Sequence, residues 1–236
     1  PNYQVFDEKR YFAAGSDTCV LELRGVPVGL TVCEDIWSDG PVERAAAAGA
    51  QLLINLNASP YDIGKQARRK ALLEGKSRDN AISILYANLV GGQDELVFDG
   101  GSLVYDHSGE LAVEAPQFAE GLFPVEFLYD HHCQPLSQPP LPEPSLEENI
   151  YRALVLGVRD YVNKNGFRSV VMGLSGGIDS ALTLAVAVDA LGADRVRAVM
   201  MPFRYTSSMS LEDAEAQARA LDVHYDVFSI EPMYDA

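Results

Sequence analysis

The sequence predicts an α/β protein in two parts, a layered α/β sandwich followed by a doubly wound parallel sheet. Three observations support this fold class. Short strand-like runs separated by Gly or Asx turns fill much of residues 1–132. Five prolines between Cys133 and Leu146 deny that stretch helix and central-strand hydrogen bonds, so we place a linker at residues 133–145. Residues 146–236 begin with a helix and then alternate strand, helix, strand, helix and strand, which is typical of a parallel sheet.

In the first part, residues 19–33 predict two strands around a turn at Gly25, Val26 and Pro27. The second strand is apolar enough to be buried on both faces, and Cys33 lies at its end. An Ala-rich helix, a buried strand, a loop and a second helix follow over residues 41–49, 51–56, 57–62 and 63–80. Further short strands are expected at residues 81–90, 95–100, 101–106, 110–115 and 122–127.

In the second part, the first helix begins with a capping box at Ser145 and stops at Gly166. The alternating elements that follow are expected at residues 168–174, 180–192, 195–203, 211–223 and 224–230. A doubly wound sheet binds ligands at the carboxyl ends of its strands, so the loops after the first two strands are the places to look for a site.

Composition narrows the class of protein. At 236 residues and 47% apolar residues, the chain can form one large or two modest domains. Its formal charge of −16 disfavours binding to nucleic acid and to anionic membranes. No apolar run suggests a membrane span or secretory signal, so we expect a cytoplasmic protein with three free cysteines. Because the sequence opens on Pro1 without Met and stops after a strand-like run, we expect a segment of a longer polypeptide.

The segment Leu174–Ser180 has the features of a phosphate loop. It lies between a buried strand and a helix, where free backbone N–H groups and the helix dipole attract an anion. The Walker lysine is absent, which argues against kinase chemistry. Asp179 would repel phosphate unless a metal ion lay between them. The plain alternative is a tight turn with Ser180 as helix cap.

The loop after the next strand, MMPFRYTSSMS, lies at the same edge of the sheet and would supply backbone groups and hydroxyls to a ligand bound there. The alternative here is an ordinary Ser-rich loop with Ser210 as N-cap. Two other features carry less weight. The KQARRK run from Lys65 to Lys70 predicts a solvated helix face with one member turned inward, and His131 and His132 lack the partners of a metal site.

Cys33 is the candidate nucleophile. A buried cysteine at a strand end is usually an inert core residue. Glu34 and Asp35 follow it directly and should raise the pKa of its thiol, so a nucleophile here needs a cation brought from elsewhere.

Two resemblances bear on these motifs. The SGGIDS string resembles the PP-loop of the ATP-pyrophosphatases, which split ATP between its α and β phosphates. This resemblance implies that Ser175, Gly177 and Ser180 cradle pyrophosphate and that Asp179 supports Mg²⁺. It also implies that Gly176, Ile178 and Met201 contribute to ATP binding.

The run VCEDIW resembles the nucleophile segment of the nitrilase superfamily, whose amidases use a Glu-Lys-Cys triad on an αββα fold. Cys33 would be the nucleophile, and the lysine and glutamate would precede Pro1. The resemblance implies that Tyr3, Glu34 and Ser59 bind glutamine, although Glu34 has a plain alternative as a solvated loop residue. Lys65 stands where such enzymes often have an arginine, so it keeps the charge on the glutamine carboxylate but loses the bidentate fork.

Taken together, the motifs PNY, VCEDIW, NASP, GGQDELVFDGGS, SGGIDS and MPFRYTSS resemble the glutamine-dependent NAD⁺ synthetases over essentially the whole chain. The first part would be the C-terminal portion of the nitrilase-like domain, and the second the N-terminal portion of the PP-loop domain. The resemblance implies three substrates, glutamine, ATP and nicotinate adenine dinucleotide, and a homo-oligomer whose size the sequence does not give. The alternatives are a stand-alone amidase with a vestigial nucleotide domain, another PP-loop amidotransferase, and a non-catalytic scaffold that binds nucleotide.

Overall fold

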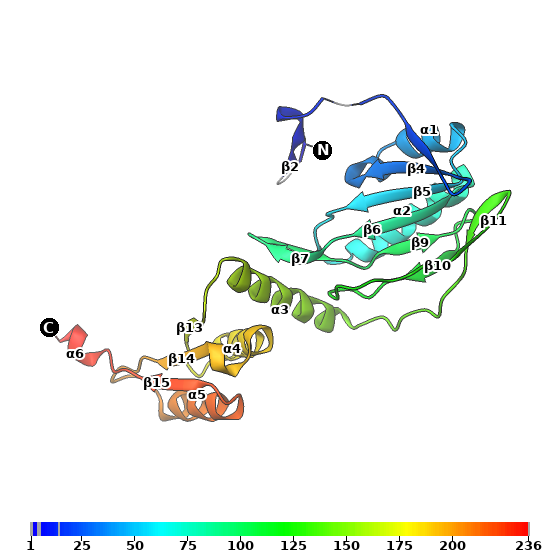
Figure 1. Cartoon of the computed structure of the whole chain (residues 1–236). Coiled ribbons are helices and arrows are strands. Elements are labelled where there is room, and N and C mark those ends of the chain that lie inside the picture. Colours follow the sequence, from blue (N-terminus) through cyan, green and yellow to red (C-terminus); the bar gives the residue numbers. More distant parts are fainter. Residues whose placement is uncertain (1, 4–5, 14, 236) are drawn as a thin grey trace. The chain divides into compact units, whose positions relative to one another are not determined.

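The computed structural model describes residues 2–3, 6–13 and 15–235, which form two compact units (Figure 1). The first unit contains the residues as far as Val90 together with Phe98–Glu143. The second unit contains Gly91–Val97 together with the residues from Pro144 onward. Across the described residues, no helix is both long and apolar enough to cross a bilayer.

The first unit is built on a six-stranded mixed sheet in the order β10-β9-β6-β5-β4-β3. Its strands are β3 (Cys19–Leu23), β4 (Val26–Val32), β5 (Leu52–Asn57), β6 (Ser83–Asn88), β9 (Leu103–Tyr105) and β10 (Leu111–Glu114). The central strands β4, β5 and β6 are parallel, whereas the outer strands pair antiparallel. The carboxyl ends of β4, β5 and β6 therefore meet at one edge of the sheet.

Two helices cover one face of this sheet, α1 (Pro41–Ala47) and α2 (Lys65–Asn80). Leu73 of α2 packs with Leu53 and Ile84 in a core whose members are fully buried. The predicted helices and crossover strands are thus present, each starting or ending within about two residues of its expected bounds. Burial of Leu73 sets which side of α2 faces the sheet. The helix begins soon after the loop that follows β5.

The other face of the sheet is only partly covered. The hairpin of β11 (Phe127–Asp130) and β12 (His132–Pro135) places Phe127 and Cys133 against Val28 and Leu52. Farther along the strands, Val32 is 64% exposed and Leu56 is 54% exposed. The prediction that β4 is buried on both faces is therefore wrong for the described part of the chain.

Residues 122–127 are another departure. The sequence predicted a strand there, but these residues are irregular as far as Phe127, where β11 begins, and Leu122 is 99% exposed. Pro124 has no N–H to give to a sheet ladder, which explains why the apolar run does not pair. Within the predicted linker, β12 continues to Pro135, and residues 136–145 form no helix or strand.

The second unit contains a three-stranded parallel sheet, β13 (Val170–Gly173), β14 (Val196–Met200) and β15 (His224–Val227). Helix α3 (Leu146–Lys164) is capped by Ser145, whose hydroxyl accepts a hydrogen bond from the Glu148 amide at 3.2 Å. Helices α4 (Ile178–Leu191) and α5 (Ser208–Ala220) pack on the sheet through Leu184, Ala198 and Ala214. The strands are ordered as in the sequence, so the described residues do not include the reversal that defines a doubly wound sheet.

The hairpin of β7 (Val90–Gln93) and β8 (Leu96–Asp99) contributes its tip, Gly91–Val97, to the second unit. There the Gly92 backbone lies against α3. A side chain on Gly92 would place its Cβ 3.2 Å from the Gly157 Cα and 3.1 Å from the Asp160 Cβ. Glycine at both positions lets the hairpin and helix backbones approach this closely. The remaining short elements are β1 (Asn2–Tyr3), β2 (Phe6–Asp7), η1 (Glu8–Arg10), η2 (Cys33–Ile36), η3 (Ala193–Arg195) and α6 (Glu231–Tyr234).

Candidate functional site

Cys33 is held in a strained backbone conformation at the carboxyl edge of the six-stranded sheet. It follows β4 directly and has a φ of 49°, in the left-handed region that residues other than glycine rarely adopt. The Asp35 carboxylate accepts a hydrogen bond from the Val32 amide at 2.9 Å, and the Asn55 side chain donates to the Cys33 carbonyl at 3.5 Å. Strained residues that their surroundings hold in place are concentrated at functional sites. These hydrogen bonds therefore hold the backbone on both sides of the Cys33 Cα.

The surroundings of the Cys33 sulfur raise its pKa. Burial is the largest cause, and the carboxylates of Glu34 and Glu8 also raise the pKa, whereas backbone N–H groups of Ala58 and Glu34 donate toward the sulfur and lower it. The prediction that Glu34 opposes thiolate formation is confirmed. The Asp35 carboxylate instead accepts the hydrogen bond from the Val32 amide. A thiolate nucleophile at this position needs a nearby cation.

Glu34 and Lys65 lie around the same edge of the sheet. Burial is the main cause that lowers the pKa of Lys65, and Glu34 acts in the opposite direction on the same amine. The Lys65 ammonium stands over the Trp37 ring, 4.4 Å from its centroid. Trp37 ends the η2 turn that begins with Cys33 and Glu34, so the structure places Lys65 at the same end of the sheet as these two residues.

Ser59 lies in the loop between β5 and α2 and is 4% exposed. Its amide donates to Asn88 Oδ1 at 2.9 Å, and its hydroxyl accepts from the Arg69 guanidinium at 3.2 Å. The hydroxyl thus has a protein partner within the fold. Tyr3 lies in β1, paired with Phe6 of β2, and its side chain falls outside what the structure describes.

A buried ion pair stands behind this loop. Arg69 and Asp99 are joined at 2.9 Å, and their side chains are 0% and 1% exposed. Arg69 is the inward-facing member expected within the KQARRK run, so that prediction is confirmed. Asp99 was not singled out, because it comes from β8, 30 positions along the chain, and nothing local in the sequence links the two residues.

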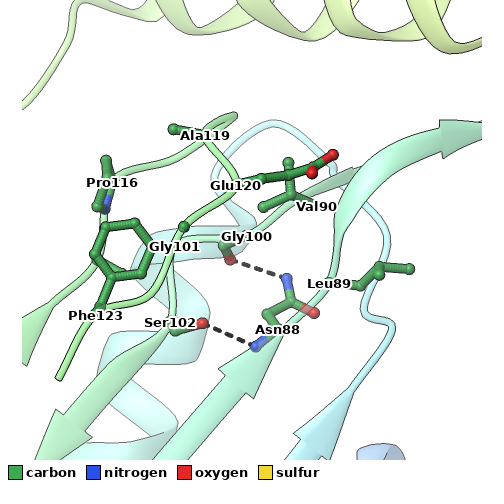
Figure 2. A pocket seen from close by; sticks show the side chains of 12 residues that line it. Asn88, Leu89, Val90, Gly100, Gly101, Ser102, Pro116, Ala119, Glu120 and Phe123 are labelled. Atoms are coloured by element: carbon green, nitrogen blue, oxygen red, sulfur yellow. Dashed lines mark hydrogen bonds between the residues drawn. The ribbon is translucent and has the colours of Figure 1, made fainter. Parts of the chain in front are cut away.

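A cavity of about 470 Å³ in the first unit is lined in part by residues at and after the ends of β6 and β8, among them Asn88, Gly100 and Ser102. Figure 2 shows Asn88 at the wall of this cavity. Its side-chain nitrogen, Nδ2, donates a hydrogen bond to the Gly100 carbonyl at 2.9 Å. The Asn88 backbone N–H donates to the Ser102 hydroxyl, also at 2.9 Å. Asn88 therefore joins the cavity wall to the Ser59 loop.

The predicted phosphate loop lies in the second unit, between β13 and α4. Ser180 Oγ donates to the Gly177 carbonyl at 2.9 Å and lies 3.1 Å from Ser175 Oγ, so the two hydroxyls meet inside the loop. Gly176 has a φ of 78°, and a Cβ there would collide with the backbone of Ser210. The loop is therefore closed by the first turn of α5, and any side chain at Gly176 would force it open.

The remaining predicted nucleotide residues surround this loop. Asp179 is exposed in the first turn of α4, next to Ile178, which is 80% exposed. Met201 follows β14 directly at the same carboxyl edge and is 52% exposed. Ser207 caps α5 and accepts from the Ser210 amide at 3.1 Å, so the alternative that made Ser210 the N-cap is wrong by three residues. Among the residues with described positions, no group of three His, Cys, Asp or Glu side chains is arranged to hold a metal by itself.

The chain is similar to proteins of known family along its whole length. A glutamine-dependent NAD⁺ synthetase from Acinetobacter baylyi is 46% identical over 238 residues, covering all of this chain and 43% of that protein. A solved structure of the Acinetobacter baumannii glutamine-dependent NAD⁺ synthetase in complex with ADP superposes with a TM-score of 0.95 at 46% identity, and this chain covers 44% of it. The Cytophaga hutchinsonii enzyme, with a TM-score of 0.80 at 18% identity, shares the fold.

The chain spans less than half the length of the relatives it matches. Within it, residues 150–236 match the NAD synthase family model, and residues 1–127 match the carbon-nitrogen hydrolase model. The nitrilase-like part therefore precedes the NAD synthase part, and the resemblance carried by VCEDIW and SGGIDS is confirmed. The carbon-nitrogen hydrolase model matches more than half of the 236 residues. The chain therefore belongs to the carbon-nitrogen hydrolase family, here joined to an NAD synthase segment.

Proposed function

We propose that this chain carries the cysteine nucleophile and the ATP-binding loop of a glutamine-dependent NAD⁺ synthetase. The observation that carries the proposal is one polypeptide with two sites, each at the carboxyl ends of parallel strands. One edge presents a strained cysteine, and the other presents the closed SGGIDS loop. The names of the similar proteins favour the same activity.

At the first site, the Cys33 thiolate attacks the side-chain amide carbon of glutamine. The carbon–nitrogen bond breaks, the nitrogen takes up a proton and leaves as ammonia, and a thioester remains on Cys33. Water then hydrolyses the thioester to glutamate. Because the surroundings raise the pKa of Cys33, the reaction needs the lysine and glutamate that the family resemblance places before Pro1.

Glutamine itself would be bound by Tyr3, Glu34, Ser59 and Lys65. The Lys65 ammonium suits the substrate carboxylate, and the Glu34 carboxylate suits the substrate ammonium. The two opposite charges lie at the same end of the sheet, which suits a substrate that carries both.

At the second site, the carboxylate of nicotinate adenine dinucleotide attacks the α phosphorus of ATP, and pyrophosphate leaves. Ammonia then displaces AMP from the acyl adenylate to give the amide. The loop residues Ser175, Gly176, Gly177, Ile178, Asp179 and Ser180 would bind the phosphates, and Met201 would lie near the adenine. The exposed Asp179 carboxylate beside the loop fits Mg²⁺, which would neutralise phosphate charge when bound.

The exposed side chains of Val32 and Leu56 support an αββα arrangement in which a second sheet covers that face. We assign residues 1–132 to the glutaminase portion, 133–145 to the linker and 146–236 to the synthetase portion, whose sheet would become doubly wound when extended. We also propose a cytoplasmic homo-oligomer, as the resemblance implies.

The products of ATP provide the decisive test. The complete protein is supplied with ATP labelled at the α phosphate, nicotinate adenine dinucleotide, and either glutamine or ammonia. We expect the label in AMP with both nitrogen donors, because the loop has no Walker lysine for γ-phosphoryl transfer. Label in ADP rejects the proposal. Glutamine hydrolysis with no consumption of ATP would identify a stand-alone amidase instead.

A further inference from the structure

The buried pair Arg69–Asp99 is an unexpected feature to find beside a nucleophile. Two opposite charges removed from water gain little over an apolar pair of similar volume, so stability alone does not account for them. Asp99 Oδ2 also accepts from Gln117 at 2.7 Å, and Arg69 Nη1 lies 3.1 Å from Gln66 Oε1, so the pair is fixed on both sides.

The second nitrogen of the guanidinium, Nη2, faces the loop after β5. It donates to the Ser59 carbonyl at 2.9 Å, to the Ser59 hydroxyl at 3.2 Å and to the Pro60 carbonyl at 3.4 Å. Loop carbonyls of this kind normally bind water. Here a buried, planar cation holds two consecutive carbonyls in place.

The residue just before this anchored pair is Ala58. The parallel register pairs Val32 of β4 with Leu56 of β5, so Cys33 and the loop that contains Ala58 leave the sheet side by side. The backbone N–H of Ala58 lowers the pKa of the Cys33 thiol. The Ala58–Ser59 peptide is also fixed from the opposite side, because the Ser59 N–H donates to Asn88 Oδ1 at 2.9 Å. Arg69 thus holds this loop by donating to the Ser59 and Pro60 carbonyls, and Asn88 holds it by accepting from the Ser59 N–H.

We propose that Arg69, held by Asp99, is a positioning residue for Cys33, because it fixes the Ser59–Pro60 carbonyls and so keeps the Ala58 N–H aimed at the sulfur. Its own side chain is fully buried, so the proposed effect on Cys33 passes through the loop. The consequence for glutamine hydrolysis rests on the function proposed above, whereas the consequence for the thiol does not. An N–H group aimed at sulfur favours the thiolate, which is the reactive form.

Two variants of the complete protein test this role. Arg69→Lys keeps the charge beside Asp99 but cannot reach two carbonyls and the carboxylate at once. Arg69→Met combined with Asp99→Asn removes both charges, keeps an acceptor for Gln117, and is expected to fold because neutral replacement of a buried pair is often tolerated. Arg78→Met is the matched control, since Arg78 lies on the same helix with its side chain 56% exposed.

The first measurement is the rate of iodoacetamide alkylation against pH, followed on the peptide that contains Cys33 so that the exposed Cys19 does not contribute. Both Arg69 variants should shift this profile to higher pH, and Arg78→Met should not. The second measurement is steady-state kinetics. Both variants should lower kcat for glutamine-driven synthesis by about 10²-fold, the scale of a misplaced catalytic group, while ammonia-driven synthesis is unchanged.

An alkylation profile that is unchanged in whichever variant folds, as judged by circular dichroism, overturns the proposal. The pair would then only link α2 to β8. A protein that does not fold with either variant overturns it as well, because the pair would then be needed for folding. A shifted profile in a protein without glutaminase activity would keep the positioning role and reject the proposed function.

Discussion

The Gly92 amide donates a hydrogen bond of 2.8 Å to the Asp160 carboxylate, joining the tip of the β7–β8 hairpin to helix α3. Lys164, one turn further along α3, donates to the Gly92 carbonyl at 2.7 Å and forms an ion pair with Asp160 at 3.3 Å. Both backbone groups of a single glycine are thus bound by one helix. This contact makes the hairpin tip part of the second unit, although the strands on either side continue into the first.

Gly92→Ala is expected to lower the free energy of unfolding by about 1–3 kcal/mol, because the new methyl group would overpack against Gly157 and Asp160. Chemical denaturation measures the change. Gly75→Ala in α2 is the matched control. Its Cβ meets nothing within 4 Å, so it should stabilise the helix by about 0.5–1 kcal/mol. Equal effects of the two substitutions would contradict this account.

Asp160 should contribute to acid sensitivity. Burial raises its pKa, but the Gly92 amide, Arg159 and Lys164 together lower it below the ordinary value of 3.8. The unfolded carboxyl therefore takes up its proton first as the pH falls. The stabilisation is complete above the ordinary aspartate value and is lost as the pH falls through the lowered folded-state value. Asp160→Asn should flatten this acid limb in a series of denaturation curves, and an unaltered limb would assign the effect to other carboxyl groups.

Cys33→Ala in the complete protein should lower glutamine-driven NAD⁺ synthesis by at least about 10³-fold and spare ammonia-driven synthesis. The nucleophile serves only the transfer of the glutamine acyl group, so free ammonia bypasses it. NAD⁺ formation with each nitrogen donor is the measurement. Loss of both activities to the same degree would show that the two sites are not separate.

Asp179→Asn should weaken Mg²⁺-ATP use roughly 10- to 100-fold with either nitrogen donor, because it removes a carboxylate from the phosphate loop. The apolar core formed by Leu174, Leu184 and Ala198 is untouched, so the melting temperature should change little. KM for ATP and its dependence on Mg²⁺ are the measurements. Normal ATP kinetics would make Asp179 an ordinary residue of the first helical turn.

Local patterns predicted much of the fold. Turn residues bounded β3 and β4, and the capping serine at position 145 marked the start of α3. The strand, glycine loop and helix around Ser175–Ser180 were expected from the sequence because the hydrogen bonds that shape the loop join residues close in the chain.

Features that depend on distant residues were not predicted. The partner of Arg69 lies 30 positions away on another strand, and the hairpin tip binds a helix about 70 positions later. The strand expected at residues 122–127 does not form before Phe127. Its apolar residues suggested a strand, but Pro124 lacks the N–H that a sheet ladder requires. Ser207 rather than Ser210 caps α5, since Thr206, Ser207, Ser208 and Ser210 offer several similar hydroxyls and only the backbone geometry selects one.

The left-handed backbone of Cys33 has a consequence for how this position can change. A residue with a Cβ costs about 1–2 kcal/mol in that conformation, and glycine costs almost nothing. Cysteine is therefore a poor choice for folding at its own position, and Cys33→Gly should give a more stable protein than Cys33→Ala. A lineage that came to rely on free ammonia would be expected to drift toward glycine here, gaining stability as it lost the thiol.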